Sequence, residues 1–364
     1  MILSKNYQEI HRCSTRIIAA KKVREKSLKY GDIIIEKSGG SPTQPVGRVV
    51  FFEKEDKKYL FNNFTSVLRL KDSKINFPKY VFYHLFANYK NGSTIKYQNK
   101  TTGILNLKLD RFINETELLL PSLETQKQIA KTLDTTAGLL TMRKQQLAEL
   151  DELIKSIFYN MFGDPVTNEK EWDIKQLRVL SILITKGSSP TWQGVNYTDD
   201  KSQVLFITSE NVREGYLDFS KRKYLEKKFN EIQNRSILKY GDLLVNIVGA
   251  SIGRAAVFYS DEVANINQAV ALVRCNKEVC LTYLCYYLNS PKALQMYNEM
   301  QVDVARANLS LKNIGDLAII YPPIPLQNQF AEIVARIEAQ KALVKKAIDE
   351  TQYLFDSLIS QYFE

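Results

Sequence analysis

Residues 129–161 read IAKTLDTTAGLLTMRKQQLAELDELIKSIFYNM, and residues 330–362 read FAEIVARIEAQKALVKKAIDETQYLFDSLISQY. Both stretches carry mostly apolar residues at spacings that alternate between four and three, and the second copy lies 201 positions after the first. A seven-residue repeat of this length is typical of a coiled-coil seam. We therefore expect two helices of about 36 residues, roughly 55 Å each. The ten seam positions of the first copy are Ile129, Leu133, Thr136, Leu140, Arg143, Leu147, Leu150, Ile154, Ile157 and Met161.

Polar residues interrupt both seams. They are Thr136 and Arg143 in the first copy and Lys341 and Thr351 in the second. One interpretation is that a partly open seam tolerates them. The other is that they fix the register and orientation of the helix pair, as single polar residues do in coiled coils. The sequence does not separate the two.

The repeat extends beyond the helices. The pentapeptide LKYGD occurs at 28–32 and again at 238–242, each time before a short apolar strand pattern and a Gly/Ser turn. The matched order of six elements indicates an internal duplication of about 200 residues. The other matched stretches are 62–70 with 266–275, the helix candidates 80–86 with 283–289, Asn106-Leu107 with Asn308-Leu309, and 118–130 with 320–331.

The duplication predicts an α+β protein in which each long helix follows a globular head of mixed α/β structure. We expect the first head over 1–120 and the first long helix over 121–162, and then the second head with its leading linker over 163–321 and the second helix over 322–364. Prolines precede both helices, and Gly163 with Asp164-Pro165 ends the first. The first head lacks about 39 residues that would match the start of the second, WDIKQLRVLSILITKGSSPTWQGVNYTDDKSQVLFIT.

Composition limits the class of protein. Fifty Lys and Arg against 40 Asp and Glu give a net charge of +10, which favours a polyanionic partner. No apolar run approaches the roughly 18 residues of a membrane span, and the start MILSKNYQEIHR lacks the apolar region of a signal peptide. We therefore expect a cytoplasmic protein. The four cysteines, Cys13, Cys275, Cys280 and Cys285, lack zinc-site spacing and are expected to be idle thiols.

Catalytic motifs are missing from the sequence. The chain contains no GK[ST], GxGxxG, HExxH or GxSxG pattern, and its two histidines, His11 and His84, have no matching nucleophile nearby. The sequence thus predicts no catalytic residue, no bound cofactor and no metal site. A binding function fits this pattern better than an enzyme.

Several loops combine small polar residues with a base or an aromatic residue. Such loops can bind base edges and phosphates, and glycines let a backbone approach a phosphate closely. The alternatives are ordinary surface loops and hairpin turns, with Trp192 as a packing anchor. The DNA-binding candidates are Lys37, Ser38, Ser41, Arg48, Lys100, Thr101, Lys186, Ser188, Ser189, Thr191, Trp192, Asn211, Arg213, Arg254 and Arg306. Arg48 and Arg254 follow a glycine in matched turns. Because this arginine is retained in both copies, it is a stronger candidate than an arginine present in one copy alone.

The twofold order of these motifs resembles the specificity subunits of Type I restriction-modification systems. The resemblance rests on LKYGD in both copies, GASIGR (249–254), NINQAV (265–270), MFGDPVTNEKEW (161–172) and PPIPLQNQFAEIV (322–334), and it covers essentially the whole chain. It implies two target-recognition domains joined by two long antiparallel helices in a coiled coil, with a pseudo-twofold repeat.

The resemblance also implies a function. Each head would read one half of a split double-stranded DNA target, and the helices would set the gap. Adenine methyltransferase subunits and a motor-nuclease subunit would bind this chain and carry the S-adenosylmethionine, ATP and Mg²⁺, while the chain itself would be non-catalytic. A second hypothesis from the same sequence is a non-catalytic coiled-coil scaffold with two protein-binding heads.

Overall fold

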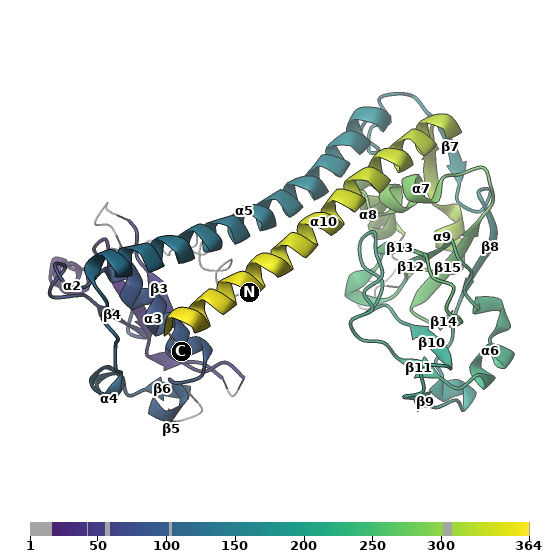
Figure 1. Ribbon diagram of the computed structural model, residues 1–364. Coiled ribbons are helices and arrows are strands. Elements are labelled where there is room, and N and C mark those ends of the chain that lie inside the picture. The colour runs from purple at the N-terminus through teal and green to yellow at the C-terminus, as the bar shows by residue number, and fades with distance from the viewer. Residues whose placement is uncertain (1–16, 42, 55–58, 102–103, 301–307, 364) are drawn as a thin grey trace. The chain divides into compact units, whose positions relative to one another are not determined.

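The computed structural model describes residues 17–41, 43–54, 59–101, 104–300 and 308–363, and of Lys100 and Thr101 the backbone only (Figure 1). The chain divides into two compact units. The first comprises Met1–Ala148 and Ala342–Glu364, and the second comprises Glu149–Lys341. Each unit contains one head and part of each long helix.

The two long helices are α5 (Leu123–Phe162) and α10 (Ile324–Phe363), of 40 residues each. They are longer than the expected 36, and their first and last residues differ by the same 201 positions as the heptads. Local chemistry sets the ends of α5. The Ser122 hydroxyl accepts the Thr125 N–H at 3.2 Å, and Gly163, at φ +79°, donates its N–H to the Tyr159 carbonyl at 2.8 Å.

The seam positions of both helices are confirmed, since none of the twenty is exposed. In the first unit Leu133 shares a core with Phe355, and in the second unit Phe158 packs on Phe330. Higher numbers on one helix therefore face lower numbers on the other in each unit, and the helices run antiparallel. Buried residues outside the heptad, Ala130, Phe158, Phe162 and Ile359, widen the apolar stripe where the helices pack on the heads.

Three of the four polar seam residues make contacts between the helices. Arg143 donates from Nη1 to the Ala347 carbonyl at 2.6 Å and to the Thr351 hydroxyl. Lys341, with 12% of its side chain exposed, lies 2.6 Å from an Asp151 carboxylate oxygen.

Other contacts of the polar seam residues stay within one helix. Lys341 also pairs with Glu338 of α10, and the Thr136 hydroxyl donates to the Thr132 carbonyl of α5. A shifted register would break the contacts of Arg143 and Lys341 with the facing helix. These contacts favour the interpretation that Arg143, Lys341 and Thr351 fix the register.

The first head is built on two small antiparallel sheets. The strand orders are β3-β1-β4 and β2-β6-β5, and α3 (Pro78–Lys90) packs against β3. Ile33 and Ile35 of β1 are fully buried and form a core with the aromatic face of α3. The other bounds are α2 Ala20–Lys26, β1 Ile33–Glu36, β2 Ser38–Gly39, β3 Val49–Phe51, β4 Thr65–Leu68, η2 Ile95–Tyr97, β5 Gln98–Thr101, β6 Ile104–Leu107 and α4 Leu109–Glu115.

The second head is larger. Its sheets have the orders β13-β12-β15-β8, β14-β10-β11-β9 and β16-β7, and only the β10–β14 pair is parallel. The strands are β7 Asp173–Gln176, β8 Ser181–Lys186, β9 Tyr197–Thr198, β10 Val204–Ile207, β11 Tyr224–Leu225, β12 Asp242–Asn246, β13 Ala255–Phe258, β14 Ala264–Ile266, β15 Val270–Cys275 and β16 Ala318–Tyr321. The helices are η3 Thr191–Gln193, α6 Lys228–Ile232, η4 Asn234–Ser236, η5 Gly249–Ser251, α7 Leu281–Leu288, α8 Pro291–Glu299 and α9 Leu311–Asp316.

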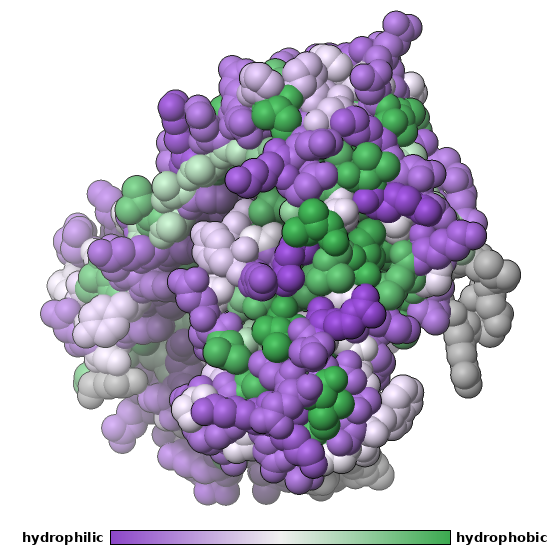
Figure 2. Space-filling view, turned by 90° about the vertical axis from the view of Figure 1, so that its right-hand side faces the viewer, coloured by the Kyte–Doolittle hydropathy of each residue, from purple (hydrophilic) through white to green (hydrophobic). Residues whose placement is uncertain are grey.

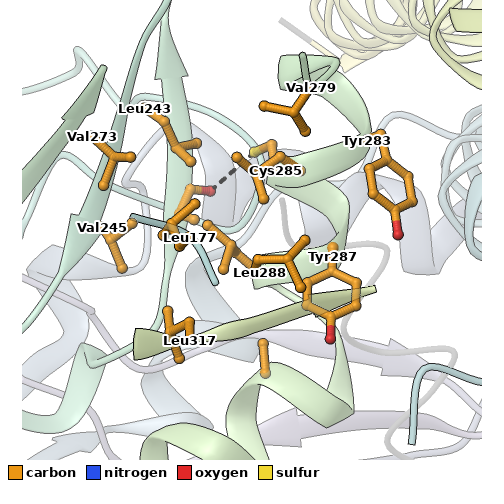
Figure 3. Packing of buried hydrophobic residues seen from close by; sticks show 14 of the residues in the cluster. Leu177, Leu243, Val245, Val273, Val279, Tyr283, Cys285, Tyr287, Leu288 and Leu317 are labelled. Atoms are coloured by element: carbon orange, nitrogen blue, oxygen red, sulfur yellow. Dashed lines mark hydrogen bonds between the residues drawn. The ribbon is translucent and has the colours of Figure 1, made fainter. Parts of the chain in front are cut away.

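Helix α7 covers one face of the β12–β15 sheet. Figure 3 shows Leu243 and Val245 of β12 opposite Cys285 and Leu288 of α7, all buried, with the Cys285 thiol donating to the Ala255 carbonyl at 3.5 Å. Successive side chains of a strand point to opposite faces, so Leu243 and Val245 of β12 face α7 while Leu244 belongs to the core on the other side of the sheet.

The two heads repeat the same polar contacts around LKYGD. Asp242, 1% exposed, accepts Nε and Nη2 of Arg274 at 2.7 Å each and the Lys239 N–H at 2.7 Å. Asp32 makes the matching three bonds, also at 2.7 Å, with Arg69 and Lys29. The pentapeptide therefore encodes a buried carboxylate that fixes the turn before β1 in the first head and before β12 in the second.

The heads differ where the sequence predicts a shortfall. Among the described residues of the first unit, no strand precedes β1, so the β14-β10-β11-β9 sheet of the second head has no counterpart there. In the described part of the chain no helix is both long and apolar enough to cross a membrane.

The ion pairs in the two heads predict a graded effect on stability. Arg274→Ala leaves the Asp242 carboxylate buried without its partner, so we expect the second unit to lose about 3–5 kcal/mol of unfolding free energy. Urea titration followed by tryptophan fluorescence measures this, because Trp172 and Trp192 both lie in the second unit.

Arg69→Ala is the matched control. The Arg69 side chain is 46% exposed against 21% for Arg274, so its removal is expected to cost less, as followed by far-UV circular dichroism. An unchanged fluorescence midpoint in Arg274→Ala would contradict the assignment.

Candidate nucleic-acid interface

Three loops of the second head meet at one end of the β13-β12-β15-β8 sheet. The register places Lys186, the last residue of β8, opposite Ala271, and Asn246, the last residue of β12, opposite Val270. The loops that follow β8 and β12 therefore start from the same edge of the sheet. We call the surface made by residues 186–193, 208–217 and 247–254 the sheet-end surface.

Asn246 attaches the third of these loops. Its amide nitrogen donates to the Ser209 carbonyl at 3.0 Å and to the Ser251 hydroxyl at 3.1 Å. The Gly215 N–H bonds to the Ala255 carbonyl at 2.9 Å, so the 208–217 loop lies against the β12–β13 turn. The side chain of Asn246 is fully buried, and its amide oxygen Oδ1 has no hydrogen-bond partner among the described residues.

Two glycines permit this close approach of loops. A Cβ on Gly187 would lie 1.7 Å from the Ile266 carbonyl oxygen, so only glycine lets the chain leave β8 beside β14. Gly253 has φ +86°, and a Cβ there would lie 2.4 Å from the Tyr297 ring. Gly187 and Gly253 lie in loops that the sequence suggested for DNA contact. Close packing by itself also requires glycine at both positions.

Most candidates on the first of these loops reach solvent. Lys186 and Thr191 are exposed, Ser188 and Ser189 are partly exposed, and Gln193 donates to the Ser188 hydroxyl at 3.0 Å. Trp192 lies on η3 with 78% of its surface exposed. An indole this exposed is no packing anchor, and it is available to a ligand.

The two candidate arginines of the second head are only weakly paired. Arg213 lies 3.4 Å from Asp218, and hydrogen bonds from Ser220 and then from Arg213 hold the pKa of the Asp218 carboxyl below its usual range. Arg254 lies 4.0 Å from Glu214, whose side chain is 74% exposed. Pairs of this kind stabilise a fold by at most about 1 kcal/mol.

Asn211 has a different position from the other candidates. It is buried, its side-chain oxygen accepts the N–H and the hydroxyl of Thr208, and its nitrogen donates to the carbonyls of Asp218 and Lys221. These four bonds use all of its hydrogen-bonding capacity. Asn211 therefore holds the 208–217 loop in shape and has no group left for a ligand.

The candidates of the first head lie around β1, β2 and β5. Lys37 joins β1 to β2, and Ser38 donates to the Asn106 side chain at 2.6 Å. Ser41 lies 3.2 Å from the Thr43 hydroxyl, and Arg48 forms a two-pronged ion pair with Glu36. Lys100 and Thr101 belong to β5. Arg306, a third candidate arginine of the second head, lies outside the described residues.

The sequence reasoning missed a basic cavity beside the sheet-end surface. It has a volume of about 770 Å³ and lies on the β9–β11 edge, next to the 208–217 loop. Arg222 pairs with Glu262 at 2.9 Å and Lys223 with Glu210 at 3.2 Å, which neutralises much of its charge. The run Lys221-Arg222-Lys223-Tyr224, in which bases precede an aromatic residue, is the signal that could have found it.

Figure 2 looks onto the side of the second unit that carries β7 and β8, where hydrophobic residues gather within a hydrophilic surround. Ile174 and Ile182 on these strands are 60% and 69% exposed, and Val179 between them is 55% exposed. This apolar area is distinct in character from the polar and basic sheet-end surface.

Two thiols of the second head lie in surroundings that favour the protonated form. Burial raises the pKa of both Cys275 and Cys285 to about 12, and Cys275, Cys280 and Cys285 are unpaired. Cys13 lies outside the described residues. Within the described ranges no three His, Cys, Asp or Glu side chains gather in a way that could hold a metal ion.

Solved structures of low sequence identity share this fold. A chain from a study of complex assembly and conformational transition of the type I R-M system aligns with a TM-score of 0.60 at 16% identity, covering 93% of this chain and 83% of that chain. The Type I restriction-modification S subunit from M. genitalium aligns with a TM-score of 0.55 at 15% identity, covering 93% and 85%.

Curated relatives match over most of the sequence. The Type I restriction enzyme EcoBI specificity subunit of Escherichia coli is 26% identical over 333 residues, which are 84% of this chain and 68% of the relative. The MjaVIII specificity subunit of Methanocaldococcus jannaschii is 23% identical over 291 residues, 75% and 66% respectively. The chain thus spans about two thirds of the length of these relatives.

The family model described as "Type I restriction modification DNA specificity domain" matches twice, over residues 4–152 and 170–352. The two matches fall one on each head with the helix that follows it, and together they cover far more than half of the sequence. This protein therefore belongs to the family of DNA specificity subunits of Type I restriction-modification systems.

Proposed function

We propose that this chain recognises a bipartite DNA target, with one half-site read by each head and the spacing set by α5 and α10. The observation that carries the proposal is the double match of one DNA specificity domain to two copies that each contain a head and a long helix. Two heads of different content on one helix pair can bind two different half-sites.

In the second head the sheet-end surface is the proposed contact with DNA. It presents exposed or partly exposed Lys186, Trp192, Arg213 and Arg254 from three loops. Asn246 connects the 208–217 and 247–254 loops, and Asn211 holds the 208–217 loop in shape. Arginine and lysine bind phosphates or guanine edges, and loop hydroxyls reach either group. The net charge of +10 supplies the long-range attraction for a polyanion.

The proposed partners supply the chemistry. Adenine methyltransferase subunits would dock on the long helices and carry S-adenosylmethionine, and a motor-nuclease subunit would bring ATP and Mg²⁺. The exposed Lys345 and Lys346 on α10 are positions open to such a partner, whereas Lys144 on α5 is partly buried. In this proposal the chain positions the complex and performs no catalysis of its own.

Methylome sequencing of a host with and without this chain tests the proposal. We expect deletion to abolish one split methylated motif, and the chain purified with its methyltransferase to bind that duplex in a salt-dependent way. Failure to bind any duplex at low salt, together with an unchanged methylome, would reject DNA recognition and favour the protein-binding scaffold.

Helix length predicts the gap in the target. We expect one extra heptad in each helix, inserted in 144–150 of α5 and 342–346 of α10, to move the heads about 10 Å apart. At about 3.4 Å per base pair this lengthens the gap by roughly three base pairs. The insertions fall between the Arg143–Ala347 and Lys341–Asp151 contacts, so both contacts are preserved.

The readout is the methylated motif itself, determined by sequencing. A heptad inserted in α5 alone serves as the control, and it is expected to abolish methylation because the seams no longer match. A gap that stays the same after the paired insertion would reject the role of the helices.

Trp192 provides an optical test of the sheet-end surface. We expect DNA to change the tryptophan emission of the wild-type complex and to leave that of Trp192→Phe almost unchanged, since the Trp172 indole is fixed by a 3.0 Å bond to the Phe162 carbonyl. Unfolding free energy should shift by no more than about 0.5 kcal/mol, because the side chain is exposed. An equal DNA-induced change in both proteins would remove Trp192 from the interface.

A further inference from the structure

The arginines that follow a glycine in the two heads stand on the same backbone frame. In the first head the Glu36 N–H bonds to the Arg48 carbonyl at 2.8 Å, and the Gly47 N–H bonds to the Glu36 carbonyl at 3.0 Å. In the second head Asn246 makes the same two bonds with Arg254 and Gly253, both at 2.9 Å. Glu36 therefore matches Asn246, and Arg48 matches Arg254.

The carboxylate at this position holds the arginine of the first head. Glu36 accepts Nε of Arg48 at 2.9 Å and Nη2 at 2.7 Å, a two-pronged geometry that uses one edge of the planar guanidinium. The Glu36 side chain is only 16% exposed, so water screens the pair poorly. The carboxylate therefore offsets the charge of Arg48 and occupies its Nε–Nη2 edge, which weakens the attraction of this arginine for a phosphate.

The second head has no acid at the matched position. Asn246 is neutral, and its amide nitrogen is directed to the carbonyls of Ser209 and Val212 and to the Ser251 hydroxyl. Arg254 has only the distant and exposed Glu214 as an acidic partner among the described residues. With asparagine in place of the acid, Arg254 has no close carboxylate at this position. The asparagine amide also holds the 208–217 loop, which carries Arg213.

We propose that Arg254 binds a DNA phosphate from the second head, and that Glu36 withholds the matched Arg48 from DNA in the first. Position 36/246 thereby decides whether the duplicated arginine contributes to DNA affinity. The inference rests on the proposed function and adds a residue-level asymmetry between the heads. A phosphate contact is sequence-independent, so it can be measured on a duplex of mixed sequence.

The test compares matched variants of the full chain in complex with its methyltransferase subunits, titrated with a fluorescein-labelled mixed-sequence duplex at several salt concentrations. Losing one phosphate contact reduces the slope of log K against log[salt] by about 0.9. We expect Arg254→Ala to lose this amount and several-fold affinity, Arg254→Lys to retain most of the slope, and Arg48→Ala to change neither quantity.

The converse variant tests Glu36 itself. Glu36→Gln keeps the shape of the side chain and removes its charge, so Glu36 no longer offsets the charge of Arg48, and the slope is expected to rise by up to about 0.9. Arg48→Ala in the Glu36→Gln background should cancel the rise. No rise in Glu36→Gln would overturn the role assigned to Glu36.

The outcomes separate this inference from the proposed function. If the wild-type complex binds no duplex, DNA recognition itself fails, and this inference fails with it. If the wild type binds but Arg254→Ala and Arg48→Ala behave alike, only the asymmetry is overturned. A loss in Arg254→Ala that is confined to the methylated target, with an unchanged slope on mixed-sequence DNA, would overturn the phosphate contact in favour of a base contact.

Discussion

The antiparallel seam between α5 and α10 is the constraint on which the rest of the structure depends. Its apolar positions also belong to the cores of the heads, as Phe355 does in the first unit and Phe330 in the second. Burying Arg143 and Lys341 between the helices costs desolvation, and in this register the carbonyl of Ala347 and the carboxylate of Asp151 on the facing helix offset part of that cost. Within each unit the helix seam and the core of the head therefore share contacts.

The two heads share the contacts that stabilise their fold, and they differ in the side chains on their surfaces. Both heads contain a buried ion pair, that of Asp32 in the first and of Asp242 in the second, with the same donor–acceptor distances. The backbone hydrogen bonds of the glycine turns between β1 and β3 and between β12 and β13 also match closely in length. The side chains at the sheet ends differ, and among the described residues the β14-β10-β11-β9 sheet occurs in the second head alone. The two heads thus combine a common geometry with different surface chemistry.

The fold could be predicted from the sequence because it rests on periodicity and repetition. The heptads predicted every seam position, and LKYGD located a core strand in each head, β1 and β12. The site was less accessible to sequence reasoning, because hydrogen bonds between distant residues decide it. Asn211 and Arg254 were both DNA-binding candidates from the sequence. The hydrogen bonds of Asn211 with Thr208 and Asp218 show that Asn211 has a structural role. The match of Arg48 with Arg254 was visible, but the effect of Glu36 required coordinates.

The identical offset of the helix bounds has an evolutionary consequence. Since α5 and α10 begin, end and repeat in the same phase, a recombination between the two copies anywhere within the helices would preserve the heptad and its caps. Such an exchange would pass a whole head from one half of a gene to the other without disturbing a single seam contact of its own. New pairings of heads can therefore arise in one genetic event.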